Sequence, residues 1–186
     1  MYHHVVDCTS RGRVRLCALV ATLALSGLMA GHAGADRILP PEVPTDLVVP
    51  AGNKVFLVAH AVGTQNYTCT GGAWGPAVPD AQLFGDNGHQ IGTHYAGPTW
   101  EFLDGSTAVA TRMAAAQVPG AIPWLLLRVV STTTGPDGDR FTSTTYIQRV
   151  NTTGGTAPAG SCTDGATASV PYTADYYFYR AGSDNQ

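Results

Sequence analysis

Short runs of β-branched, aliphatic and aromatic residues alternate with turn residues along most of the chain, and this pattern predicts strands. Residues 54–62 (KVFLVAHAV) are apolar at both alternating sets of positions, which is typical of a central strand buried on two faces. Residues 122–131 (IPWLLLRVVS) have the same character, and the last run, residues 170–179 (VPYTADYYFY), is short and aromatic. The hydrophobic pattern therefore favours an all-β protein.

Turn motifs indicate how these runs connect. Asn87-Gly88 and Asp104-Gly105 are dipeptides of hairpin turns. Residues 135–138 (GPDG) supply a third turn, which joins the run 122–131 to a further expected strand over residues 140–150 (RFTSTTYIQRV). Strands joined by hairpins predict a single antiparallel β-sandwich or barrel-like domain. Residues 108–117 are the one helix candidate, but they lack a cap and Pro119 follows, so we expect a strand and then a loop there.

The N-terminal residues 1–35 have the pattern of a signal peptide. Arginines at 11, 13 and 15 precede an apolar run over 16–30, and small residues follow at 33–35. We expect cleavage between Ala35 and Asp36, and hence a secreted protein of the extracellular space or cell envelope. The apolar run holds about 15 residues, fewer than the roughly 20 that a membrane-spanning helix needs, so no membrane span is expected.

After the leader, residues 36–50 are rich in proline and predict an extended arm, and residues 51–186 would form the single β domain. The whole chain has a net charge of −3; without the leader, seven Lys and Arg face twelve Asp and Glu. This acidic balance argues against nucleic acid as a partner, because no basic stripe is present for phosphates. No sequence feature sets an oligomeric state.

Cysteine usage supports the same compartment. Only Cys69 and Cys162 remain after the leader, and two leftover thiols in an oxidising compartment usually form a disulfide. Closing a loop of about 90 residues would stabilise the fold by up to about 4–5 kcal/mol in the chain-entropy model. Two free thiols or half of a metal site are the alternatives.

Several segments together resemble a known family. They are residues 63–69 (GTQNYTC), 92–106 (GTHYAGPTWEFLDGS), 122–127 (IPWLLL), 146–152 (YIQRVNT) with the following Gly154-Gly155, and 171–178 (PYTADYYF). In order and spacing they resemble the secreted family of domain of unknown function 3455, found in bacteria, fungi and plants. The resemblance implies export, a mostly-β domain and a Cys pair. Some fungal members are labelled malate dehydrogenases, but no strand here leads into a G-x-G-x-x-G turn and a helix, so the sequence does not support that activity.

The densest candidate chemistry is His94 with Glu101 and Asp104. A histidine and two carboxylates could act as acid and base groups or hold a cation, as in a secreted hydrolase or metal-assisted enzyme. Alternatively, Asp104 makes the Asp-Gly turn, and His94 pairs with Glu101 to fix the Gly-Pro corner at 97–98. Turn chemistry accounts for Asp104, which favours the structural interpretation.

Further metal-ligating side chains are scattered along the chain. A site could combine His60, Asp86, His89 and His94. No paired spacing typical of zinc supports this, so we expect no metal and no cofactor. His60 has apolar neighbours on its face of the strand, which favours a core histidine bonded to backbone. Ser106 lacks a Gly-x-Ser-x-Gly context and is interpreted as a turn residue.

Aromatic side chains are the remaining candidates for a binding site. Tyr95, Trp100, Tyr177 and Tyr179 are candidates for a stacking platform that would bind a sugar or aromatic ligand, with core packing as the alternative. Alternation places Tyr177 and Tyr179 on the opposite face of the last strand from Tyr172, Tyr176 and Phe178. We therefore expect a non-enzymatic binding or surface module whose partner is a glycan or another envelope component. Asn66 and Asn151 begin glycosylation sequons, whose use depends on the host.

Overall fold

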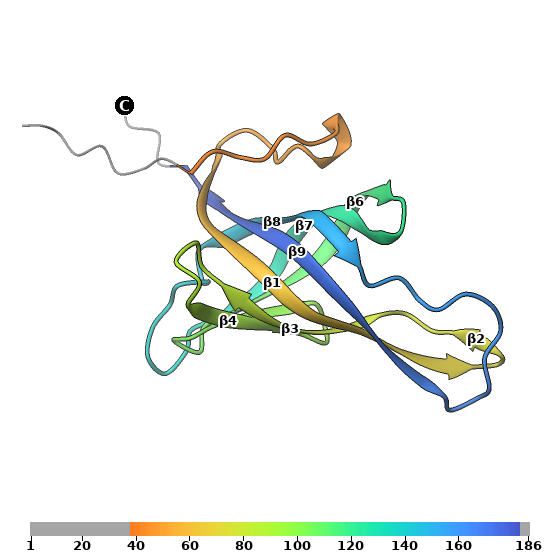
Figure 1. Cartoon of the computed structure of the whole chain (residues 1–186). Helices are drawn as coiled ribbons and strands as arrows, with labels where there is room; N and C mark the ends of the chain where they lie inside the picture. Colours follow the sequence, from red (N-terminus) through yellow and green to blue (C-terminus); the bar gives the residue numbers. More distant parts are fainter. Residues whose placement is uncertain (1–37, 183–186) are drawn as a thin grey trace, which may run out of the picture. The chain divides into compact units, whose positions relative to one another are not determined.

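The computed structural model describes residues 38–182, and these form an antiparallel sheet that closes on itself (Figure 1). The strands are β1 (Asn53–Thr70), β2 (Ala73–Trp74), β3 (Val78–Phe84), β4 (Gln90–Tyr95), β5 (Thr99–Phe102), β6 (Thr107–Val118), β7 (Ala121–Thr133), β8 (Thr144–Gly154) and β9 (Thr167–Ala181). Neighbours in the sheet follow the order β2-β1-β3-β4-β5-β6-β7-β8-β9, and β1 also pairs with β9. The expected all-β, barrel-like domain is confirmed. The expected signal peptide, residues 1–35, lies outside the described residues.

Closure of the barrel depends on the long pairing of β1 with β9. It extends from Asn53 opposite Ala181 to Thr68 opposite Thr167. The short β2 pairs only with the last two residues of β1. β1 is therefore a central strand, as predicted, with β3 on its other side. Its outer face is not fully buried, however, because Val62 is 55% exposed. A closed barrel buries one face of each strand, and the other face meets solvent unless another segment covers it.

The hairpins form at the predicted turns, but two strand boundaries differ from the sequence analysis. β6 continues to Val118, so the loop expected in its second half is wrong; pairing with β7, through register shifts, keeps it extended. β8 begins only at Thr144. Residues 140–143 instead form a turn, and its Phe141 side chain packs in the buried core.

Phenylalanine side chains close one end of the barrel. Phe141 is fully buried, stacks on Phe178 with ring centroids 4.6 Å apart, and meets Phe102 edge-on at 5.5 Å. Small interior residues make room for such rings: Ala59, Ala61, Ala81, Ala108, Ala110 and Ala174 are all buried in the same core. This aromatic filling leaves no opening for solvent around Phe141.

The Asp104 carboxylate anchors this plugged end. One oxygen accepts hydrogen bonds from the Ser106 backbone N–H at 2.8 Å and the Ser106 hydroxyl at 2.6 Å, and the other accepts the Arg140 N–H at 2.9 Å. The buried Ser106 hydroxyl oxygen in turn accepts the Phe141 N–H at 3.0 Å. Gly135 packs so closely on the backbone at residues 104–106 that a Cβ there would overlap it. The β5–β6 turn and the β7–β8 loop are thus tied together.

An arm of residues 38–52 precedes β1, and it contains the 3-10 turn η1 (Thr45–Leu47). Leu47 is fully buried, and its carbonyl oxygen accepts a 2.6 Å hydrogen bond from the buried side chain of Gln148. The hydroxyl of Tyr179 donates to the same Gln148 side chain. The arm therefore covers part of the outer surface of β8 and β9. No helix among residues 38–182 is both long and apolar enough to cross a bilayer.

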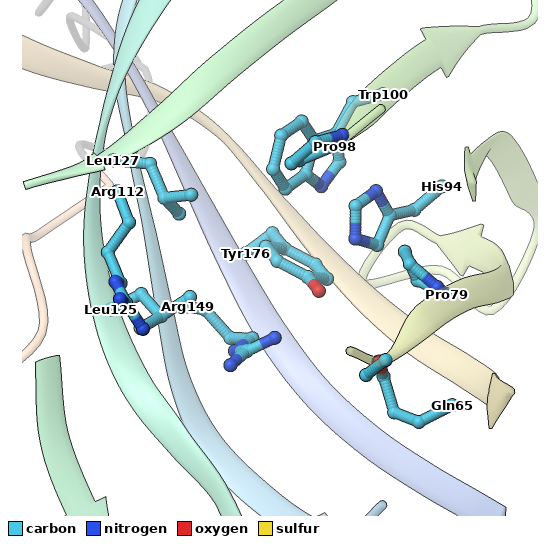
Figure 2. Close-up of a pocket in the computed structure, with 11 residues that line it drawn as sticks. Gln65, Pro79, His94, Pro98, Trp100, Arg112, Leu125, Leu127, Arg149 and Tyr176 are labelled. Atoms are coloured by element: carbon cyan, nitrogen blue, oxygen red, sulfur yellow. The ribbon is translucent and has the colours of Figure 1, made fainter. Parts of the chain in front are cut away.

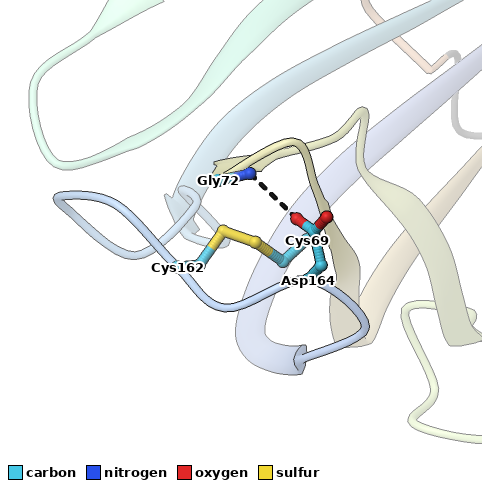
Figure 3. Close-up of a disulfide and its surroundings, with 4 residues drawn as sticks. All are labelled: Cys69, Gly72, Cys162 and Asp164. Atoms are coloured by element: carbon cyan, nitrogen blue, oxygen red, sulfur yellow. Dashed lines mark hydrogen bonds between the residues drawn. A yellow bond between two sulfur atoms is a disulfide. The ribbon is translucent and has the colours of Figure 1, made fainter.

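A disulfide joins Cys69, near the end of β1, to Cys162 in the β8–β9 loop, with their Cα atoms 6.0 Å apart (Figure 3). The Cys162 N–H donates to the Gly72 carbonyl at 3.1 Å, and the Gly72 N–H donates to the Asp164 carboxylate at 2.9 Å. The disulfide and these hydrogen bonds fasten the β8–β9 loop to the β1–β2 hairpin.

Replacing both cysteines by serine should lower the free energy of unfolding by about 2–5 kcal/mol, because the closed loop restricts the unfolded chain. Chemical denaturation of the oxidised wild type, the reduced wild type and the Cys69→Ser/Cys162→Ser double variant measures this loss. Reduced wild type and double variant should unfold at the same denaturant concentration. Equal stability of all three would show that the disulfide contributes nothing.

Candidate functional site

The end of the barrel opposite Phe141 contains a cavity of about 270 Å³ (Figure 2). Every barrel strand contributes at least one side chain to its lining, from Gln65 on β1 to Tyr176 on β9. Ala77, just before β3, and Pro98, in the β4–β5 turn, also line it. The cavity is therefore the unfilled part of the barrel interior.

His94 projects into this cavity from β4. Only 3% of its surface is exposed, and its Nδ1 lies 2.8 Å from the Thr99 carbonyl oxygen. A carbonyl only accepts, so Nδ1 carries the hydrogen and Nε2 of the neutral ring is an acceptor. Burial lowers the pKa of His94 to about 3, with a smaller contribution from the charge of Arg149 and an opposing one from the Thr99 hydrogen bond. The ring is therefore neutral at physiological pH.

The β4–β5 hairpin holds His94 in place. His94 pairs across the hairpin with Trp100, and their rings stack with centroids 4.2 Å apart. The Thr99 hydroxyl donates to the Ala96 carbonyl at 3.1 Å and so stabilises the Gly-Pro corner. Tyr176 meets both rings edge-on, at 5.2 Å from His94 and 5.4 Å from Trp100. The three aromatic rings form one wall of the cavity.

Several polar atoms around the cavity have no protein partner. The Tyr176 hydroxyl, the Gln65 side-chain nitrogen and the Trp100 ring nitrogen are buried without a hydrogen bond among the described residues. Burial raises the pKa of Tyr176, and the charge of the neighbouring Arg149 only partly offsets this, so the phenol is protonated. Buried polar atoms in native proteins normally find a partner, and these are available to a bound molecule or ordered water.

Two arginines add positive charge to the lining. Arg149, on β8, is half-buried and donates from Nε and Nη2 to the Pro123 carbonyl at 3.0 and 2.9 Å. Arg112, on β6, is exposed and lines the cavity from nearer its mouth. The described residues that line the cavity include no Asp or Glu. Neither arginine was predicted as a site residue from the sequence. Arg149 follows the inward-facing Ile147 by two positions, however, which places it on the same face of β8.

The structure does not bring His94, Glu101 and Asp104 together, so the expected pairing of His94 with Glu101 is wrong. Glu101 lies opposite Thr93, on the other face of the hairpin from His94, and accepts the Tyr95 hydroxyl at 2.7 Å. Asp104 belongs to the plugged end of the barrel. Of the three, only His94 faces the cavity.

The four aromatic candidates do not share one platform either. Trp100 lines the cavity, whereas Tyr95 lies on the outer surface with Glu101. Tyr177 is partly exposed beside Asp175, and Tyr179 is buried beside the arm. The predicted separation of Tyr177 and Tyr179 from the inward-facing residues of β9 agrees with the structure, but only Trp100 is placed to contact a molecule in the cavity.

His60 is not a core histidine. The inner positions of β1 are Ala59 and Ala61, so His60 points outward, with 45% of its side chain exposed. Its Nδ1 lies 2.7 Å from Asp175 and its Nε2 lies 3.0 Å from Asp86. His94 is in the cavity and His89 is in the β3–β4 turn. Within residues 38–182, no three or more metal-ligating side chains are grouped to hold an ion.

Comparison with known proteins places the chain in a family. A family model described as a protein of unknown function (DUF3455) matches residues 50–180. The chain belongs to this family. The match spans the barrel almost from end to end, as the motif order indicated. No curated protein matches the chain, and no solved structure does.

The His60 cluster predicts a stability term that depends on pH. The hydrogen bond to Asp175 raises the pKa of His60, partial burial opposes this, and Asp86 adds to it. Its contribution is therefore fully present below the unfolded pKa of about 6.5 and is lost as pH rises through the folded pKa. The melting temperature of His60→Gln should fall further below that of wild type at about pH 5.5 than at about pH 8.5. His89→Gln, in the exposed turn, is the control, and an equal gap at both pH values would contradict this role.

Asp104→Ala should destabilise the protein by about 1–3 kcal/mol, because it leaves the Ser106 and Arg140 donors without their acceptor. Desolvation works toward a higher pKa of Asp104, but its hydrogen bonds outweigh this and lower the pKa. Its contribution is hence present above the unfolded pKa and lost as pH falls through the folded one. Denaturant titration against Asp137→Ala, a control at an exposed aspartate of the neighbouring β7–β8 loop, measures the effect. A loss no larger than in that control would remove Asp104 as the anchor.

Proposed function

We propose that this member of the DUF3455 family is an exported binding protein that holds one small ligand inside its barrel. The observation that carries the proposal is the cavity to which all eight barrel strands contribute. An eight-stranded barrel has an interior wide enough to be filled by side chains or to hold one small molecule. Here the Phe141 end is filled and the His94 end is not.

Export is part of the proposal because of two sequence features. The leader has the three regions of a signal peptide, and the disulfide is of the kind that persists in oxidising compartments. Both features fit a protein that meets its ligand outside the cytoplasm or within the cell envelope.

The chemistry of the cavity fits binding better than catalysis. Ligand sites are commonly apolar and aromatic with a few converging polar groups, as Trp100, Leu125 and Leu127 are here beside Arg149 and Tyr176. A hydrolase built on His94 would need a carboxylate or nucleophile beside it, and Glu101 and Asp104 both lie elsewhere. The lining also argues against a glycan as the ligand. A glycan site would rely on aromatic rings for stacking, and of the four aromatic candidates from the sequence only Trp100 lines the cavity.

The proposal predicts saturable binding of small aromatic molecules, which 2-naphthoate and its neutral amide, 2-naphthamide, would test. At least one should bind with one-to-one stoichiometry and change the tryptophan fluorescence, because Trp100 lines the cavity. Ala77→Trp places a large ring at the cavity from an exposed loop and should abolish binding.

The matched control is Ala73→Trp, because Ala73 is also exposed, lies on β2 and does not line the cavity. It should bind both molecules as wild type does, and thermal melts establish that each variant is folded. Absence of binding by wild type up to millimolar ligand, or undiminished binding by Ala77→Trp, would overturn the proposed function.

A further inference from the structure

Charge within the cavity narrows the class of ligand. Residues 38–182 contain six Lys and Arg against ten Asp and Glu, yet two of the six cations and none of the acids line the cavity. The positive charge there is thus opposite in sign to that of the whole chain. A site lined by one sign of charge attracts ligands of the other sign.

Arg149 is the central cation of this site. The Pro123 carbonyl engages Nε and Nη2, which fixes the plane of the guanidinium while leaving further N–H donors for the cavity. No carboxylate of the described residues lies within ion-pair distance of it, since the ion pairs found there involve His60. A half-buried cation without a counter-charge is unfavourable until an anion joins it.

Two neutral side chains beside Arg149 also offer donors to the cavity. Among residues 38–182, the buried Tyr176 hydroxyl and Gln65 amide nitrogen have no hydrogen-bond partner. Figure 2 shows the phenol oxygen of Tyr176 on the side of the cavity where Arg149 and Gln65 lie. Nε2 of His94 is an acceptor, and the Tyr176 hydroxyl can donate or accept. Arg149 and these neighbouring donors together suit a negatively charged oxygen group at one end of a ligand.

The apolar part of the lining limits the rest of the ligand. Leu125 and Leu127 on β7 lie across the cavity from the stacked rings of His94 and Trp100, as Figure 2 shows. At about 270 Å³, the cavity holds a compact molecule of one or two rings or a short branched chain. A flat apolar body would fill this space better than a sugar with many hydroxyl groups.

From these contacts, and resting on the proposed function, we infer that the ligand is a small organic carboxylate. The planar guanidinium of Arg149 binds its carboxylate through paired N–H donors, Arg112 attracts it at the mouth, and the apolar body packs between the leucines and Trp100. A fork of guanidinium donors matches the two oxygens of a carboxylate, which a lysine could not reproduce.

The test compares 2-naphthoate with 2-naphthamide, which share one ring system and differ in charge. Wild type should bind the carboxylate about tenfold or more tighter than the amide, because charge-assisted hydrogen bonds are roughly twice as strong as neutral ones. Arg149→Gln should weaken naphthoate binding by about tenfold and change naphthamide binding by less than about twofold. Arg112→Gln should weaken naphthoate binding to a smaller extent, and only at low salt, because an exposed charge is screened.

Arg128→Gln is the matched control, since Arg128 is an exposed arginine of β7 outside the cavity lining; its affinities should equal those of wild type. The wild-type ratio decides the question even if Arg149→Gln does not fold. Carboxylate and amide bound within twofold of each other would overturn the carboxylate assignment and leave the proposed function standing. Failure of both molecules to bind would overturn the proposed function and the assignment with it.

Discussion

The pairing of β1 with β9 is the contact on which the rest of the structure depends. It joins the first and last long strands of the barrel, and the side-chain contact of His60 with Asp175 across it spans 115 positions of sequence. Without this seam the sheet would have two free edges, and Gln65 and Tyr176 would not line the same cavity. The disulfide fastens the chain near the same seam, where the β8–β9 loop meets the end of β1. Because such contacts are non-local, we expect barrel closure to be a late and slow step of folding.

Local chemistry made much of the fold predictable from the sequence. Asn87-Gly88 and Asp104-Gly105 specify hairpin turns through the backbone angles that glycine permits, and both turns are present. Features that depend on contacts between distant segments could not be predicted from local sequence. The second half of β6 is held as a strand by β7, and Phe141 leaves its expected strand because the barrel end needs filling. Neither effect is encoded within the segment concerned.

The site was predictable only in part, because the pairing register of the β4–β5 hairpin decides which side chains face the cavity. His94 and Trp100 were singled out and both line the cavity, but the hairpin pairs them with each other and turns Glu101 to the outer surface. A shift of one residue reverses the face of every side chain, so a correct hairpin does not by itself give correct neighbours. Arg149 was missed because a charged residue in a strand usually faces solvent, and only barrel closure shows that it faces inward.

The plugged end has a consequence for how a molecule could move through the barrel. Phe141, held by the Asp104 and Ser106 hydrogen bonds, fills one end of the barrel, so a molecule would enter and leave at the other end, where the exposed Ala77, Pro98 and Arg112 line the cavity. The barrel is thus open at one end only and is not a channel. An occupant must leave before a successor enters, and exchange proceeds one molecule at a time. The residence time of each bound molecule would depend on the residues at that open end.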